Sequence, residues 1–115
     1  MQPANENNMR PQGERRRALR QRVLLRGRIL STRSPVTGDC TIRNLSSQGA
    51  LVALNPEAVS ADPVLIVLRD GVAYESRIAW QSAVNAGVQF LSTVDLRGAL
   101  PPRLQRARQL WLAAS

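Results

Sequence analysis

Two groups of polar residues have the types and the spacing that an anion-binding site requires. The first lies within residues 14–23, E-R-R-R-A-L-R-Q-R-V, where five of ten residues are arginine and Arg16 and Arg20 stand four positions apart. The second is the run N-L-S-S-Q-G at residues 44–49. A guanidinium group can bind a phosphate through two parallel, charge-assisted hydrogen bonds. We therefore expect the two groups to form two halves of one anion-binding site.

The distribution of charge supports an anionic partner. All sixteen basic residues are arginine, and the net charge of the chain is +8. Residues 10–33 hold nine arginines and one glutamate, whereas the seven arginines and seven acidic residues elsewhere cancel. Because the whole net charge lies in one segment, the sequence predicts contact with a nucleotide, a nucleic acid or a membrane surface.

The composition argues against most kinds of catalysis. The chain has no histidine and one cysteine, Cys40, so it can form neither a zinc site with the usual ligands nor a catalytic triad. The eight carboxylates are scattered, and no close pair suggests a general acid and base. We expect no enzyme activity and no metal or organic cofactor. No run is long and apolar enough to span a membrane, and no secretory signal is visible, so we expect a cytoplasmic protein.

Short apolar runs between turn signals predict one small β domain. Residues 1–13 are polar, which indicates a disordered leader, and one domain is expected over residues 14–111. On the first strand, Val23, Leu25 and Ile29 share one face at period two. Trp111 is expected to anchor the C-terminal helix, and we favour the core for Trp80 over a ligand contact. The expected strands span residues 22–31, 39–45, 50–54, 64–68, 72–81 and 88–91, and the helix spans about 102–112.

The order and spacing of these features resemble a known family. An R-x-x-x-R motif (Arg16, Arg20) precedes the first strand, and an N-x-S-x-x-G motif (Asn44, Ser46, Gly49) follows the second. The later runs R-I-A-W and A-G-V-Q-F and the terminal helix are similar as well. Over roughly residues 14–111, the chain is similar to the PilZ domain, the bacterial receptor module for cyclic di-GMP, in its single-domain form.

The resemblance implies both a fold and a site. The fold is mainly β: a small six-stranded antiparallel β-barrel of the split-barrel type, with a C-terminal α-helix and a flexible N-terminal arginine-rich linker. Cyclic di-GMP, often as a stacked dimer in this family, would bind between the linker and the turn, and the output would be contact with an effector protein acting in trans. Arg15, Arg22 and Trp80 remain open as further contacts. The implied ligand-binding residues are Arg16, Arg17, Arg20, Asn44, Ser46 and Gly49.

The motif residues have distinct implied roles. Arginine can bind a phosphate, pair with the O6 and N7 atoms of guanine, or stack on a base. The resemblance implies that Asn44 and Ser46 accept hydrogen bonds from a guanine edge. Gly49 would let the backbone turn sharply or approach the ligand, since it lacks a Cβ.

Other interpretations of the same residues stay open. The run at 44–49 is also typical of a plain β-turn, and the arginines are also typical of a solvated basic tail. A small basic barrel that binds nucleic acid fits the charge, although the chain has only four aromatic residues for stacking on bases. A PilZ-like adaptor that binds protein and no nucleotide is the remaining alternative.

Overall fold

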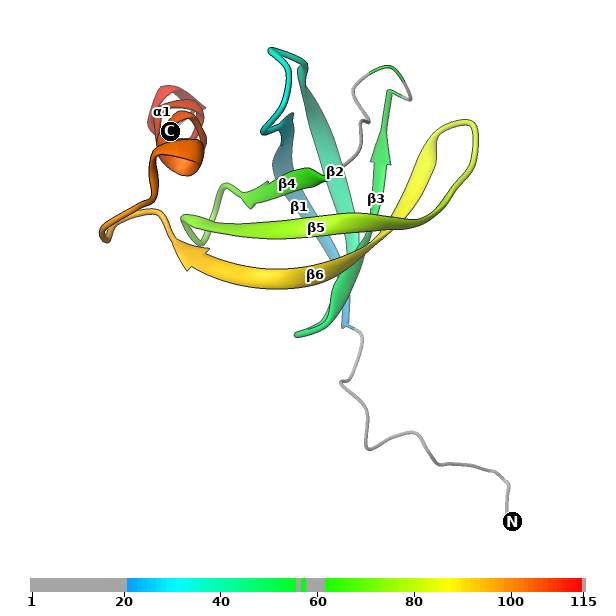
Figure 1. Ribbon diagram of the computed structural model, residues 1–115. Coiled ribbons are helices and arrows are strands. Elements are labelled where there is room, and N and C mark those ends of the chain that lie inside the picture. The colour runs from blue at the N-terminus through cyan, green and yellow to red at the C-terminus, as the bar shows by residue number, and fades with distance from the viewer. Residues whose placement is uncertain (1–20, 56, 58–61, 115) are drawn as a thin grey trace.

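The computed structural model describes residues 21–55, 57 and 62–114, and these residues form a closed six-stranded antiparallel β-barrel with one C-terminal helix (Figure 1). The strands pair in the order β1-β2-β3-β6-β5-β4 around the barrel. This confirms the predicted mainly-β barrel and its terminal helix, whereas the arginine-rich linker and the leader lie outside the described residues. The elements are β1 (Gln21–Ser31), β2 (Thr37–Leu45), β3 (Gly49–Leu54), β4 (Pro63–Val67), β5 (Val72–Gln81), β6 (Asn85–Asp95), η2 (Pro102–Leu104) and α1 (Gln105–Ala114).

The inside of the barrel is filled by alternate residues of the strands. As predicted for β1, Ile29 is fully buried in this core, and Val23 and Leu25 pack against it. Gly27 also points inward, where an added Cβ would lie 3.0 Å from the Cys40 Sγ atom and so has little space. A side chain at this position would also lie 3.1 Å from the Ile66 carbonyl oxygen of β4, so the backbones of the two strands approach closely at Gly27. The buried members of this core are Ile29, Cys40, Ile42, Ala50, Val52, Leu54, Leu65, Val67, Ala86 and Val88.

A second apolar cluster lies outside the barrel, beneath α1. It explains why all five residues of β4 are buried, since one face of this strand points into the barrel and the other toward the helix. It also explains the burial of Leu30 next to Ile29 on β1. The buried members of the cluster are Leu30, Val64, Ile66, Ala73, Leu96, Leu104 and Ala107.

The turn between β5 and β6 lies earlier than the sequence indicated. We expected the turn near residues 85–87, but β6 begins at Asn85, and the Ser82 N–H donates to the Asn85 carbonyl across the turn at 2.9 Å. Ala86 is fully buried in the barrel core, and residues 85–87 therefore belong to β6. The asparagine and glycine in this run suggested a turn, and burial of Ala86 outweighs that local preference.

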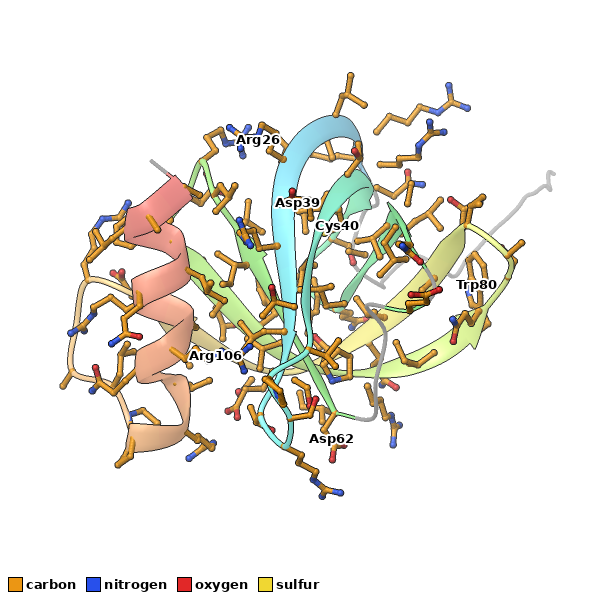
Figure 2. All side chains as sticks on the ribbon, turned by 90° about the horizontal axis from the view of Figure 1, so that it is seen from above. Arg26, Asp39, Cys40, Asp62, Trp80 and Arg106 are labelled. Carbon is orange, nitrogen blue, oxygen red and sulfur yellow. The ribbon has the colours of Figure 1, made fainter. Side chains whose placement is uncertain are left out.

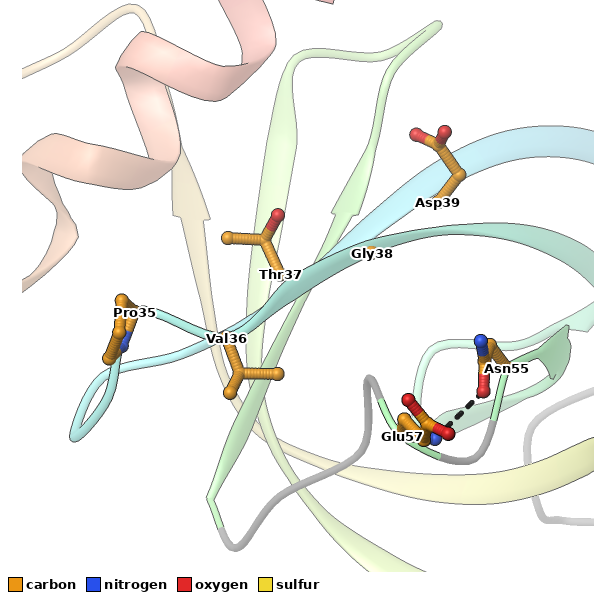
Figure 3. A pocket seen from close by; sticks show the side chains of 7 residues that line it. All are labelled: Pro35, Val36, Thr37, Gly38, Asp39, Asn55 and Glu57. Atoms are coloured by element: carbon orange, nitrogen blue, oxygen red, sulfur yellow. Dashed lines mark hydrogen bonds between the residues drawn. The ribbon is translucent and has the colours of Figure 1, made fainter.

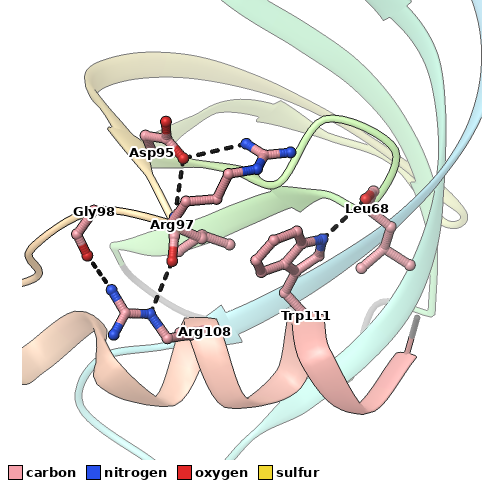
Figure 4. Close-up of polar contacts among 7 residues, drawn as sticks. Leu68, Asp95, Arg97, Gly98, Arg108 and Trp111 are labelled. Carbon is pink, nitrogen blue, oxygen red and sulfur yellow. Dashed lines mark hydrogen bonds and ion pairs between the residues drawn. The ribbon is translucent and has the colours of Figure 1, made fainter.

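Arginine side chains attach α1 to neighbouring loops. Arg106 lies between the helix and β1 (Figure 2) and donates to the carbonyls of Ser31, Ser34 and Pro35 at 3.2, 2.8 and 2.5 Å. Pro35 belongs to the loop that leads into β2 (Figure 3). Arg108 donates to the Leu96 carbonyl at 2.8 Å and to the Gly98 carbonyl (Figure 4). These bonds satisfy carbonyls that the loops would otherwise leave to solvent.

Trp111 anchors the end of the helix, as predicted. Its ring packs against the second cluster, and its Nε1–H donates to the Leu68 carbonyl at 3.0 Å (Figure 4). The Arg97 guanidinium lies 5.1 Å from the ring centroid, within the range of a cation–π contact. Helix α1 thus packs mainly against β1 and β4, and it lies away from β3 and from the turn between β5 and β6 (Figure 1). None of the helices in the described part of the chain is long and apolar enough to cross a membrane.

Glu75 links the barrel to the segment before α1, and its ionisation should contribute to stability. Arg103 donates to both carboxylate oxygens at 2.9 and 3.0 Å, and the Ser92 hydroxyl donates at 2.8 Å. The hydrogen bond from Arg103 is the main cause that holds the pKa of Glu75 below its usual value of 4.5, although partial burial opposes it. A lowered pKa means that the stabilisation is present above pH 4.5 and is lost as the pH falls through the folded-state value.

Replacing Glu75 with glutamine should lower the free energy of unfolding at pH 7 by about 1 kcal/mol or less, as is usual for a partly exposed ion pair. The difference from the native chain should shrink as the pH falls below 4.5 and vanish below the folded-state pKa, where the native carboxylate is itself protonated. Urea unfolding at pH 7 and at a pH below the folded-state pKa measures this difference in the free energy of unfolding. In an Arg103→Gln background the same substitution should matter less. A difference that is independent of pH would show that the charge of Glu75 is irrelevant to stability.

Candidate functional site

The Ser46 hydroxyl organises the turn between β2 and β3. Its Oγ accepts from the N–H groups of Gln48 and Gly49 at 3.1 and 3.2 Å and donates to the Gly49 carbonyl at 3.3 Å. The Ser46 N–H donates to the same carbonyl at 2.9 Å. A hydroxyl has one donor and two acceptor positions, so these bonds use its full capacity. Ser46 thus shapes the turn, and a ligand contact from its Oγ would have to replace one of these bonds.

Gly49 allows this turn to lie close to β6. A Cβ added at Gly49 would clash with the Val88 carbonyl oxygen, so only glycine fits at this distance from the neighbouring strand. The Phe90 N–H also donates to the Gln48 carbonyl at 2.8 Å, which fixes the turn to β6. The turn is therefore a rigid part of the barrel. The ligand contact that the motif implies for Gly49 stays a prediction.

A β-bulge turns Asn44 to the outside of the barrel. Strict alternation along β2 would place Asn44 on the same face as Cys40 and Ile42, but the pairing with β3 shifts between Ile42 and Asn44. Ile42 pairs with the buried Val52, and Asn44 pairs with Leu51, on the opposite face of β3. The extra residue in the bulge reverses the direction of the side chain. Asn44 is half-buried, and its side chain makes no hydrogen bond to another described residue.

A second bulge turns Trp80 to the outside of the barrel. We favoured the core for this residue, and this was wrong: its side chain is 48% exposed. The pairing of β5 with β6 shifts between Ile78 and Trp80, so Ile78 stays against the core while Trp80 faces outward. Figure 2 shows Trp80 at the periphery of the barrel, on β5. Its indole lies over Gly87, where any Cβ would clash with the ring.

The strand pairing joins these residues into one line across the outer face. Arg22 pairs with Asn44, Asn44 with Leu51, Leu51 with Gly87, and Gly87 with Trp80. We call these five residues the outward row; it crosses β1, β2, β3, β6 and β5. Neighbouring strands lie about 4.8 Å apart, so the row spans about 14 Å from Asn44 to Trp80. It lies on the side of the barrel that α1 leaves open (Figure 1).

A hollow of about 450 Å³ lies at the Arg22 end of the outward row. It is lined by Arg22, Val23, Leu24, Arg43, Asn44 and Leu51, and we call it the Asn44 hollow. Among the described residues, neither Arg22 nor Arg43 has an ion-pair partner, whereas Arg28 further along β1 pairs with Asp39 at 3.3 Å. The hollow therefore combines a polar amide, apolar contact surface and uncompensated positive charge. Such a lining can hold an anionic ligand that also has a flat or apolar part.

The predicted linker contacts Arg16, Arg17 and Arg20, as well as Arg15, lie outside the described residues. The described chain begins at Gln21, which pairs with Leu45, the residue before Ser46. Strand β1 therefore begins beside the polar turn.

Two other groups do not form an anion site. A hollow of about 710 Å³ lies where β2 begins and includes the carboxylates of Asp39 and Glu57 (Figure 3), which would repel an anion. Burial, with a smaller effect from Asp39, raises the pKa of Cys40 to about 12, so its thiol is not a nucleophile at neutral pH. No cluster of potential metal ligands occurs among the residues that the structure describes.

Comparison with known proteins agrees with this arrangement. Residues 14–99 match the family model of the PilZ domain, and this range includes both the arginine motif and all six strands of the barrel. The chain belongs to the PilZ domain family. PilZ domains are a known cyclic di-GMP-binding family of binding and adaptor modules, and not a family of enzymes. None of the curated proteins matches the chain in sequence.

Sequence reasoning missed several residues of this PilZ site. Arg43 and Leu51 line the Asn44 hollow, and Leu24 forms part of its wall. Arg43 was signalled by its position directly before the N-x-S-x-x-G motif. Leu24 and Trp80 could be placed only with knowledge of the bulges, which the alternation of residue types does not reveal.

Gly49→Ala should destabilise the barrel by about 1–3 kcal/mol, because the added methyl group is forced against the backbone of β6. Urea unfolding followed by circular dichroism measures the change. Gly98→Ala is the matched control, since a Cβ there meets its nearest neighbour, the Asp95 carbonyl oxygen, at 3.7 Å, an ordinary contact. Equal stability of the two variants would contradict the structural role assigned to Gly49.

Proposed function

We propose that this PilZ domain binds cyclic di-GMP on its outward row and acts as a receptor that signals to a separate protein. The observation that carries the proposal is the outward row itself, which aligns Arg22, Asn44 and Trp80 on one uncovered face. Membership of a cyclic di-GMP-binding family supplies the identity of the ligand. The row and the arginines before β1 offer each chemical group that this ligand requires.

The ligand has two phosphates and two guanines, and each finds a suitable partner. Asn44 has an unused amide whose oxygen can accept from the N1–H and N2–H₂ edge of a guanine. The exposed face of Trp80 can stack on a base, as aromatic side chains do in nucleic-acid sites. The phosphates require bidentate, charged donors, and arginine is the residue best suited to this. The span of about 14 Å suits a dinucleotide better than a single phosphate.

The remaining arginine contacts come from the motif before β1. We infer that Arg16 and Arg20 bind the phosphates or the guanine edges, with Arg17 as a third contact. Their motif is joined to β1 at Gln21, beside the polar turn, so the linker can reach the Asn44 hollow. Ser46 and Gly49 would act by shaping the turn as well as by any direct contact.

The proposal needs no metal or organic cofactor, since the nucleotide itself is the ligand. We infer that binding changes the surface offered to an effector protein, because ordering of a segment by a ligand alters what a partner meets. We place the protein in the bacterial cytoplasm, where this second messenger acts. The charge also suits nucleic acid, but the outward row has one exposed aromatic residue, and extended base stacking needs several.

Isothermal titration with cyclic di-GMP should show saturable binding to the native chain. Arg16→Ala and Arg20→Ala should each weaken it by about 10- to 100-fold, since each removes a charge-assisted hydrogen bond worth about 1.5–3 kcal/mol. Arg33→Ala is the control, because Arg33 pairs with Asp62 beyond the far end of β1. Lack of binding at high micromolar nucleotide would refute the function. Normal binding by both motif variants would refute the location, and DNA binding at physiological salt would favour the nucleic-acid alternative.

Trp80→Ala should weaken nucleotide binding by about 5- to 100-fold, which corresponds to the 1–3 kcal/mol of a base–aromatic stack. The fluorescence of Trp80 should also change on binding, and it can be followed alone in a Trp111→Phe chain, which has no other tryptophan. A Trp80→Phe variant, which keeps an aromatic face, should retain most of the affinity. Unchanged affinity of Trp80→Ala would remove Trp80 from the site.

A further inference from the structure

A second hollow lies on the other side of Leu24 from the Asn44 hollow. It measures about 390 Å³ and is lined by Leu24, Leu25, Arg26, Leu68, Arg69 and Ala114. We call it the Leu68 hollow. Leu24 lines both hollows, so a molecule in either one would contact the same side chain. The lining is apolar except for its two arginines.

The exposure of Leu24 is a consequence of the sheet geometry. The pairing of β1 with β2 shifts between Arg22 and Leu25, and Leu24 falls within this irregular stretch. Leu24 is 78% exposed, more than any other large apolar residue in the described part of the chain. An exposed leucine next to an apolar-floored hollow is a typical feature of a protein-interaction surface.

The floor of the Leu68 hollow is held from two sides. The Leu68 N–H donates to the Arg26 carbonyl of β1 at 3.3 Å, and the Leu68 carbonyl accepts from the Trp111 Nε1–H of α1 at 3.0 Å (Figure 4). The peptide of Leu68 is thus fixed between the barrel and the helix. A hollow with such a floor is already formed before a partner arrives, which reduces the ordering cost of binding.

The rim of the hollow carries uncompensated positive charge. Arg69 is balanced by Asp70, with bonds of 2.7 and 3.3 Å between the two side chains. Arg26, in contrast, forms no ion pair within the described part of the chain. Figure 2 places Arg26 beside the turn between β4 and β5, at the end of the barrel where α1 finishes. Arg22, four positions earlier on the same strand, likewise has no ion-pair partner among the described residues.

We propose that the Leu68 hollow docks the effector protein through an acidic segment that carries one apolar anchor residue. The anchor would insert beside Leu24, Leu25 and Leu68, and its acidic neighbours would pair with Arg26. A buried apolar anchor surrounded by charged pairs is the usual arrangement of an interaction hot spot. The concave shape favours an inserted side chain over the surface of an anionic membrane. This inference rests on the proposed function and extends it by giving the chemistry of its partner.

The test uses the full chain, labelled with ¹⁵N, and a short synthetic peptide with a central leucine flanked by glutamates, without cyclic di-GMP. The peptide should shift the amide signals of Leu24, Arg26 and Leu68 and the indole signal of Trp111. Peptides with glutamine for glutamate, or with serine for leucine, should bind at least tenfold more weakly. No shifts up to millimolar peptide, shifts at other residues, or equal binding of the glutamine peptide would overturn the proposal.

Matched variants separate the surface from general charge. Arg26→Glu should weaken peptide binding at least tenfold, whereas Arg26→Lys should keep most of it. Leu24→Ser should also weaken it, and Leu91→Ser, at a leucine of β6 that is 59% exposed, should have no effect. Retained binding by Arg26→Glu would overturn the proposal, as would vesicles of phosphatidylglycerol that shift the same signals when the peptide does not. Nucleotide titration of the same samples keeps the two proposals apart, because either can fail while the other holds.

Discussion

In a closed antiparallel barrel, successive side chains must alternate between the packed interior and the outside, and this constraint governs every part of the structure. Ile42 and Ile78 obey it and point into the core. The residue pairs that follow them do not continue the alternation, because a bulge shifts the pairing in β2 and again in β5. The two bulges bring Asn44 and Trp80 to the same outer face, where a ligand can reach both.

The outer surface of the barrel is divided between two tasks. One side carries an apolar cluster that α1 covers. The helix is held there by hydrogen bonds that Arg106, Arg108 and Trp111 donate to carbonyl groups. The other side stays open and carries the outward row. The two sides meet near Leu24, which lines a hollow in each direction. The helix therefore covers part of the barrel surface and also lines the hollow that we propose binds the partner.

The sequence predicted the barrel, the helix and the family because these depend on alternation, turn residues and motif order. It did not predict the bulges, since a bulge adds one residue without changing the residue types around it. For this reason the alternation left the face of Asn44 undecided, and Trp80 was assigned to the core. It also did not show that Ser46 forms its hydrogen bonds within the turn, or that the close approach of β6 leaves no space for a side chain at Gly49. The Ser46 bonds are local but depend on the folded shape of the turn, and the contact of Gly49 with Val88 joins residues that are distant in sequence.

Occupation of the outward row by cyclic di-GMP can be tested by titrating the ¹⁵N-labelled chain with this nucleotide and following the amide and indole NMR signals. The largest shifts should occur at the amides of Asn44, Leu51 and Gly87 and at the indole of Trp80. Saturable shifts confined to the hollow at the start of β2, for example at Thr37 and Asn55, would contradict binding at the outward row.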